Sequence, residues 1–160
     1  MNSIDCGYWE VTVEAHGRIK LPAALLKLLE ESERKSFVVS RGFGKHLSLW
    51  TQAAFTKQLE FLNSLDMNII RNRKYRNAFI KGTAYLDADA QGRLIIPKSL
   101  IAAAEIDKEM AIVLDNGAME LWDKQRYEAE FNMSDEEFME LNQQIHIERS
   151  QSGREATDVS

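Results

Sequence analysis

The sequence predicts an α+β fold made of two pseudo-symmetric β-β-α-β-β-α repeats that together form one small barrel. The first observation behind this prediction is a repeated segment, because HGRIKLP at 16–22 matches QGRLIIP at 91–97 after an offset of 75 residues. The second is that Leu49-Trp50 matches Leu121-Trp122 after an offset of 72. Two copies are too few for a solenoid and indicate a single globule with an internal pseudo-twofold axis.

The repeats set the domain organisation that we expect. The first repeat spans about 8–65, the second about 83–132, and a linking segment of 66–82 joins them. A C-terminal helix over about 134–149, opened by a Ser134 capping box, completes a single domain of residues 1–150. The last residues, 151–160, are small and polar and are expected to be disordered.

Each repeat begins with two strands around a glycine turn. Apolar and polar residues alternate over 9–13 and 83–87, which is typical of strands. Gly17 and Gly92 then mark turns in which a positive φ is expected. A short apolar strand follows each turn and ends at one of the two prolines of the chain.

The two prolines mark the starts of two helices. Pro22 and Pro97 are expected at the first helical position, where the missing N–H costs nothing and φ is already set. The predicted helices cover 23–31 and 98–104, with leucine, isoleucine and alanine at helical spacing.

A hairpin and a closing helix complete each repeat. In the second repeat, apolar runs flank Asn116-Gly117, the strongest short signal for a hairpin. The equivalent runs of the first repeat, 37–40 and 47–50, flank a loop with two glycines. Thr51 and Asp123 are expected to cap the closing helices. Because four short strands cannot close a stable core alone, we expect the two halves to interleave their hairpins.

Charge is distributed unevenly along the chain. Residues 1–127 contain 18 Lys+Arg and 16 Asp+Glu, whereas residues 128–160 contain 2 and 9. The net charge is therefore +2 for the first part and −7 for the second, which gives the −5 of the whole chain. Because local charge decides a binding face, the acidic end does not exclude a nucleic-acid-binding body.

The composition predicts a soluble cytoplasmic protein. A single cysteine, Cys6, allows no intramolecular disulfide and leaves a thiolate zinc cluster without ligands. No apolar run is long enough to span a membrane, and residues 1–5 lack the features of a signal peptide. We expect no membrane association.

No catalytic or metal site and no cofactor are expected. The three histidines, at 16, 46 and 146, are far apart in sequence and none has a partner at metal-ligand spacing. The sequence motifs of zinc proteases, P-loop proteins and serine hydrolases do not occur. Cys6 has no nucleophile signature around it and is interpreted as a plain thiol. We therefore expect no enzyme and no small-molecule substrate.

Each repeated turn carries an acid four residues before an arginine. The pairs are Glu14 with Arg18 and Asp89 with Arg93. An ion pair across the turn would orient the guanidinium and leave its other donors free for a phosphate or a guanine edge. Alternatively, the pair only closes the turn, and the sequence leaves both interpretations open.

The paired acid-x-x-x-Arg turns, each leading to a proline-started helix and a hairpin that ends in Leu-Trp, resemble the MraZ family over about residues 8–140. MraZ proteins are bacterial transcriptional regulators of the division and cell-wall gene cluster, in the swapped-hairpin AbrB superfamily. The resemblance implies an AbrB-like barrel in which the two halves imitate a dimer. It also implies a nucleoid-associated homo-oligomer, a ring that binds direct repeats in double-stranded promoter DNA.

The resemblance also implies roles for individual residues. The residues expected to contact DNA are Arg18, Arg93, His16, Gln91 and Lys20. Glu14, in place of the more usual aspartate, and Asp89 are expected to orient the two arginines. The residue before the motif glycine is often basic in the family, whereas here it is His16 and Gln91. Lys20 follows Arg18 on the same face of its strand and is expected to contact phosphate.

Three other features keep more than one interpretation. The basic segment 71–81 is either a second DNA patch or a segment that packs Tyr75 and Phe79 in the core or on a neighbouring subunit. The tryptophans at 50 and 122 are expected in the core rather than as a stacking platform. The acidic helix docks on a neighbour, repels DNA from one side of the ring, or is simply solvated.

Together these observations predict a sequence-specific DNA-binding transcriptional regulator. The rival hypothesis is a non-catalytic protein-interaction or assembly module of the same fold that lacks DNA binding. The acidic balance, His16 and Gln91 favour this rival.

Overall fold

The structure, a computed structural model, describes residues 5–158 and the side chains of residues 5–153. The strands are β1 (Cys6–Thr12), β2 (Arg18–Lys20), β3 (Ser36–Arg41), β4 (Leu47–Thr51), β5 (Ala84–Asp87), β6 (Arg93–Ile95), β7 (Glu109–Asp115) and β8 (Ala118–Asp123). The α-helices are α1 (Ala23–Leu28), α2 (Gln52–Ser64), α3 (Ile70–Lys81), α4 (Lys98–Ala103), α5 (Lys124–Phe131) and α6 (Asp135–Asp158).

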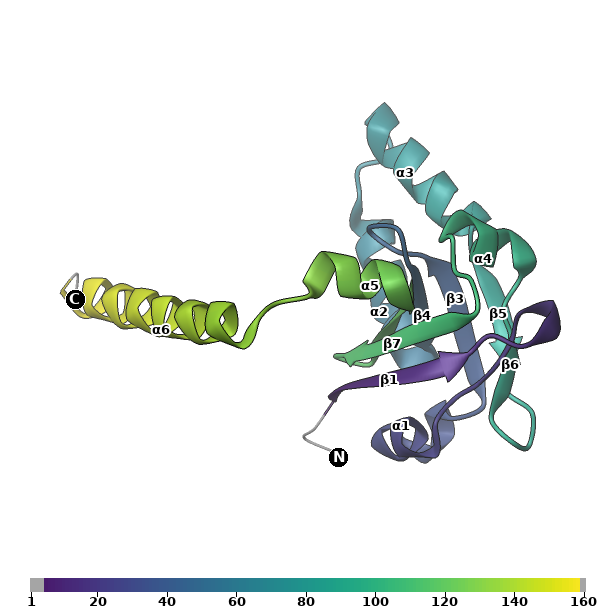
Figure 1. Cartoon of the computed structure of the whole chain (residues 1–160). Helices are drawn as coiled ribbons and strands as arrows, with labels where there is room; N and C mark the ends of the chain where they lie inside the picture. The colour runs from purple at the N-terminus through teal and green to yellow at the C-terminus, as the bar shows by residue number, and fades with distance from the viewer. Residues whose placement is uncertain (1–4, 159–160) are drawn as a thin grey trace. The chain divides into compact units, whose positions relative to one another are not determined.

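The strands form two antiparallel sheets in which the repeats exchange partners (Figure 1). The six-stranded sheet has the order β1-β7-β8-β4-β3-β5, and β2 pairs with β6. Strand β1 of the first repeat thus pairs with β7 of the second, and β5 of the second pairs with β3 of the first. The predicted α+β fold with interleaved hairpins is confirmed.

The strand register shows where the pseudo-twofold axis lies. In the β2/β6 pair, Ile19 faces Leu94, its equivalent in the other repeat. In the β4/β8 pair, Ser48 faces Glu120, again its equivalent. A residue that faces its own equivalent lies on the axis, so the axis passes through both pairs. The two repeats therefore imitate a symmetric dimer within one chain.

Two apolar clusters hold the first 127 residues together. The larger cluster is lined by both repeats and includes Ile19, Leu94, Val39 and Ile112, none of which is exposed. The smaller cluster joins α2 and α3 to the sheet. Its members are Val38, Trp50, Phe55, Leu62 and Phe79. Trp50 and Trp122 are both buried, as the sequence predicts.

Most local predictions are confirmed. Gly17 and Gly92 both have φ of +76°, and Asn116 and Gly117 both have positive φ, as a tight hairpin turn requires. The Thr51 side chain accepts a hydrogen bond from the backbone N–H of Ala54, which caps α2. Asp123 and Ser134 cap the starts of α5 and α6 in the same way.

The position of the prolines and the ends of several helices differ from the predictions. Pro22 and Pro97 are N-cap residues with extended ψ rather than first helical residues, whereas α1 and α4 begin at Ala23 and Lys98 as predicted. Helix α1 also ends at Leu28, because Leu29 turns its buried side chain into the core in an extended conformation. The linking segment contains a whole helix, α3, that the second repeat lacks.

The C-terminal part forms a compact unit of its own. The contacts divide the chain into residues 1–127 and 128–160. Helix α6 continues to Asp158, beyond the end expected near Arg149, so 151–158 is helical where disorder was expected. The final residues, 159–160, lie outside the described part of the chain. Among the described helices, none is both long and apolar enough to cross a membrane.

The glycine turn before β2 gives a direct test of the fold. A Cβ added to Gly17 would lie 2.4 Å from the carbonyl oxygen of Ile96, at a φ that side chains avoid. We expect Gly17→Ala to destabilise the protein by about 2 kcal/mol or more, and to lower the melting temperature by roughly 4–8 °C. Gly153→Ala is the matched control, because an added Cβ there meets no atom of the described residues within 4 Å. Equal melting temperatures for the two variants in circular dichroism would contradict this account.

Candidate nucleic-acid interface

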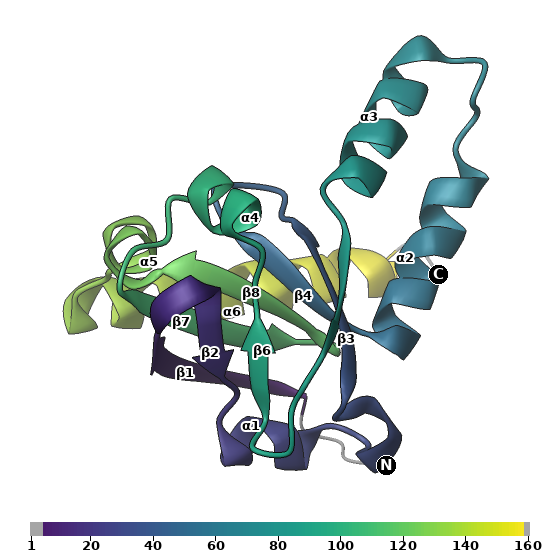
Figure 2. The ribbon, with the colours of Figure 1, turned by 90° about the vertical axis from the view of Figure 1, so that its right-hand side faces the viewer.

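The β2/β6 ribbon brings the two repeated motifs together (Figure 2). Arg18 faces Ile95 and Lys20 faces Arg93 across the pair. Directly opposed residues share a face, and alternate residues of a strand point to the same side. Arg18, Lys20, Arg93 and Ile95 therefore form one outer surface, which we call the ribbon face.

The inner side of the ribbon fixes this orientation. Ile19 and Leu94 lie between the ribbon-face residues and are both 0% exposed. A register shift by one residue would place the cations in the core and these side chains in water. On the outer side, Arg18 and Lys20 are exposed and Arg93 is half-buried. The apolar core thus holds three cations on one surface.

The turns themselves lie at opposite ends of the ribbon. The Gly17 carbonyl accepts from the N–H of Ile96, and the Gly92 carbonyl accepts from the N–H of Leu21, so each turn adjoins the far end of the other strand. The two motif arginines are consequently diagonal neighbours on the ribbon face rather than opposed across it. His16 and Gln91 are both exposed, one in each turn.

In the first turn the acid contacts the arginine side chain. Arg18 Nε lies 2.9 Å from Glu14 Oε2, with both side chains about half exposed. This pair fits the predicted orienting role of Glu14, although an exposed ion pair adds little stability. His16 has a φ of +63° in this turn, a left-handed conformation that few side chains adopt.

In the second turn the acid acts differently. Asp89 Oδ1 accepts hydrogen bonds from the backbone N–H groups of Gln91 and Arg93, each at 2.9 Å. Among the ion pairs of residues 5–153, none involves Asp89. The shorter aspartate side chain binds the turn backbone. Asp89 therefore stabilises the turn and does not form the expected ion pair with the Arg93 guanidinium.

The electrostatics of Asp89 link the two motifs. Its pKa lies below the ordinary value, chiefly because the backbone N–H of Arg93 donates to the carboxylate. The N–H of Gln91 and the charges of Arg93 and Arg18 lower the pKa further, against partial desolvation. Asp89 is therefore an anion beside the two cations, and it offsets part of their charge.

One member of the ribbon face was not predicted from the sequence. Ile95 is 61% exposed at the end of β6 and occupies the position equivalent to Lys20. The sequence could have predicted this exposure, because side chains alternate along a strand and Ile95 must point outward if Leu94 and Ile96 point inward. The ribbon face is thus symmetric in its arginines and asymmetric in Lys20 and Ile95.

The other features considered in the sequence lie outside the ribbon face. The basic segment forms α3, with Phe79 buried and Tyr75 exposed, and it contributes no residue to the ribbon face. Cys6 is an exposed free thiol on β1. Within the described part of the chain, no group of three His, Cys, Asp or Glu could hold a metal ion.

Comparison with known proteins identifies the family. The family model described as "MraZ protein, putative antitoxin-like" matches residues 7–76 and 79–147, once for each repeat. Proteins named "Transcriptional regulator MraZ" are similar over most of their length. The one from Christiangramia forsetii is 31% identical over 140 residues, which is 87% of this chain and 90% of the relative.

Two further relatives with the same name agree. The protein from Flavobacterium psychrophilum is 30% identical over 91% of this chain and 92% of its own. The protein from Cytophaga hutchinsonii is 30% identical over 84% and 89%, respectively. The resemblance drawn from the doubled turns is confirmed, and the chain belongs to the MraZ family.

Proposed function

We propose that this protein is a sequence-specific DNA-binding transcriptional regulator and not an enzyme, and that the ribbon face contacts the DNA. The observation that carries the proposal is the placement of Arg18, Lys20 and Arg93 on one outer surface, held there by buried Ile19 and Leu94. A two-stranded antiparallel ribbon fits the major groove of B-DNA. The names of the relatives support a role in transcription.

The residues of the ribbon face and its turns contact the DNA in different ways. Arg18 is pinned by Glu14 through Nε, which leaves its terminal nitrogens for a phosphate or a guanine edge. Arg93 and Lys20 take part in no ion pair among residues 5–153, so their charges are available to phosphates. His16 and Gln91 lie at the two ends of the ribbon. Their side-chain N–H groups extend the contact along the DNA backbone.

The protein acts on DNA as a homo-oligomer. Three cations on one ribbon neutralise few phosphates, so a single chain binds weakly and with little selectivity. Several ribbons at fixed spacing gain affinity through effective concentration when the DNA sites repeat at the same spacing. We therefore propose a ring that binds direct repeats upstream of the division and cell-wall gene cluster, in the cytoplasm on the nucleoid.

The paired arginines give the principal test. Arg18→Ala with Arg93→Ala removes about 1 kcal/mol or more of binding free energy per arginine, together about thirtyfold in affinity or more. The measurement is a gel shift with the duplex upstream of the protein's own gene, in excess scrambled competitor.

Folding and charge need a matched control in that experiment. Lys57→Ala with Lys108→Ala removes the same charge from exposed positions outside the ribbon face and is expected to bind as the wild type does. Both variants should keep the wild-type melting temperature and oligomer size. Undiminished binding by the arginine variant would move the site elsewhere, and no binding by the wild type would favour the interaction-module hypothesis.

Ile95 gives a second, chemically specific test. An exposed β-branched side chain on a DNA-binding surface is suited to contact the C5-methyl group of thymine. Replacing the contacted thymine by uracil removes that methyl group and should weaken wild-type binding about fourfold. Ile95→Ala should bind the thymine and uracil duplexes equally, whereas uracil outside the bound sequence should affect neither protein. Equal sensitivity of the two proteins to uracil would exclude this contact.

A further inference from the structure

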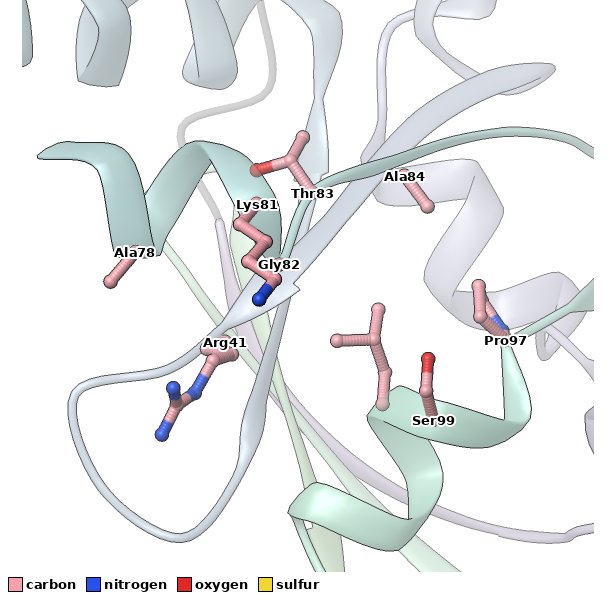
Figure 3. A pocket seen from close by; sticks show the side chains of 9 residues that line it. Arg41, Ala78, Lys81, Gly82, Thr83, Ala84, Pro97 and Ser99 are labelled. Carbon is pink, nitrogen blue, oxygen red and sulfur yellow. The ribbon is translucent and has the colours of Figure 1, made fainter.

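A groove beside α3 is lined by apolar side chains and cations. A cavity of about 300 Å³ lies between α3 and the β3–β4 loop, lined by Arg41, Phe43, Tyr75 and Ala78 among others. It adjoins a second cavity, of about 470 Å³, which shares Arg41 and Ala78 and adds Lys81. Figure 3 shows Arg41 and Lys81 on one side of this second cavity and Pro97 and Ser99 on the other. We call the surface formed by Arg41, Phe43, Tyr75, Ala78 and Lys81 the α3 groove.

The residues that form the α3 groove are exposed. Phe43 is 76% exposed at the tip of its loop, and Tyr75 is also exposed. Neither Arg41 nor Lys81 takes part in an ion pair among residues 5–153. The rest of α3 adds four further cations, and no acid occurs between Asp66 and Asp87. An apolar surface with positive charge around it favours an apolar partner that carries negative charge.

Helix α6 has the complementary surface. Phe138, Leu141 and Ile145 follow the i, i+3, i+7 spacing of one helix face, and all three are exposed. Glu137 lies one turn before Leu141 and Glu148 one turn after Ile145, so acids flank both ends of this apolar stripe. The unit that contains α6 carries a net charge of −7, against +2 for the unit that contains α3.

The two surfaces also match in length. The stripe from Phe138 to Ile145 spans about 10 Å of helix, and α3 from Tyr75 to Lys81 spans about 9 Å, at about 1.5 Å per residue. Every copy of the chain carries both the apolar stripe of α6 and the α3 groove, and these two surfaces differ from each other. A contact between them in two copies is therefore head-to-tail, and repetition of a head-to-tail contact produces a closed ring or an open filament.

We infer that α6 of one chain docks in the α3 groove of a second copy. Its apolar stripe lies on Phe43, Tyr75 and Ala78, and its acids lie near Arg41 and Lys81. The inference rests on the proposed homo-oligomer and names the surfaces that build it. One such contact is small, so each is weak alone and gains strength from closure of the ring.

Charge reversal with complementation tests the inference. Variant A carries Arg41→Glu and Lys81→Glu, and variant B carries Glu137→Lys and Glu148→Lys. In each variant alone, like charges meet at the contact, and we expect self-association to weaken by about tenfold or more. In an equal mixture, helix α6 of A meets the wild-type groove of B, and the basic α6 of B meets the acidic groove of A. The mixture should therefore regain the wild-type oligomer size in light scattering after size exclusion.

Controls separate this contact from a general effect of charge or folding. Lys57→Glu with Lys108→Glu makes the same charge change as variant A at other exposed positions and should keep the wild-type size. Circular dichroism should show wild-type helix content for A and B. The inference is overturned if the wild type is monomeric, if A and B keep the wild-type size, or if their mixture stays dissociated. A gel shift with wild-type protein tests DNA binding independently, so failure of the docking and failure of the proposed function are distinguishable.

Discussion

The pairing of β2 with β6 is the constraint on which the rest of this molecule depends. It joins the two repeats at their shared axis, where Ile19 packs beside Leu94 at 0% exposure. Because side chains alternate along a strand, burial of these two residues forces their neighbours outward. The same apolar contact that stabilises the barrel thus positions Arg18, Lys20 and Arg93. Folding and the candidate DNA surface share one cause.

The features predicted from the sequence are those that short segments determine. The positive φ of Gly17 and Gly92, the tight turn at Asn116-Gly117 and the cap at Thr51 each depend on a few adjacent residues. The interleaved hairpins also follow from the sequence, because the internal repeat supplies long-range information that a single copy lacks. The family followed from the doubling of the motif for the same reason.

The features that the sequence did not predict depend on contacts between distant residues or on side-chain length. Asp89 and Glu14 occupy equivalent positions, yet one methylene group decides that aspartate binds the turn backbone while glutamate contacts its arginine. The exposure of Ile95 depends on the burial of Leu94 against both repeats. Helix α3 lies outside the repeat, so no second copy indicated its structure.

Some features of the chain occur in both repeats, and others occur only once. The equivalent arginines give the ribbon face two similar halves, whereas Lys20 and Ile95 make those halves different, so the proposed DNA-binding surface has a direction. A directional surface suits sites repeated head to tail, and the head-to-tail contact proposed between α6 and the α3 groove suits the same arrangement. Helix α3 occurs once, in the segment that links the two repeats, so each chain offers one groove of this kind.

The salt dependence of DNA binding tests the ribbon face most directly, because each phosphate contact contributes to the slope of log affinity against log salt concentration. Lys20→Ala removes one proposed phosphate contact from each ribbon, so its slope should be shallower than that of the wild type by about 1 for each ribbon bound to the DNA. Lys57→Ala, which lies on α2, should keep the wild-type slope. Identical slopes for Lys20→Ala and the wild type would contradict the assignment of the ribbon face as the DNA-binding surface.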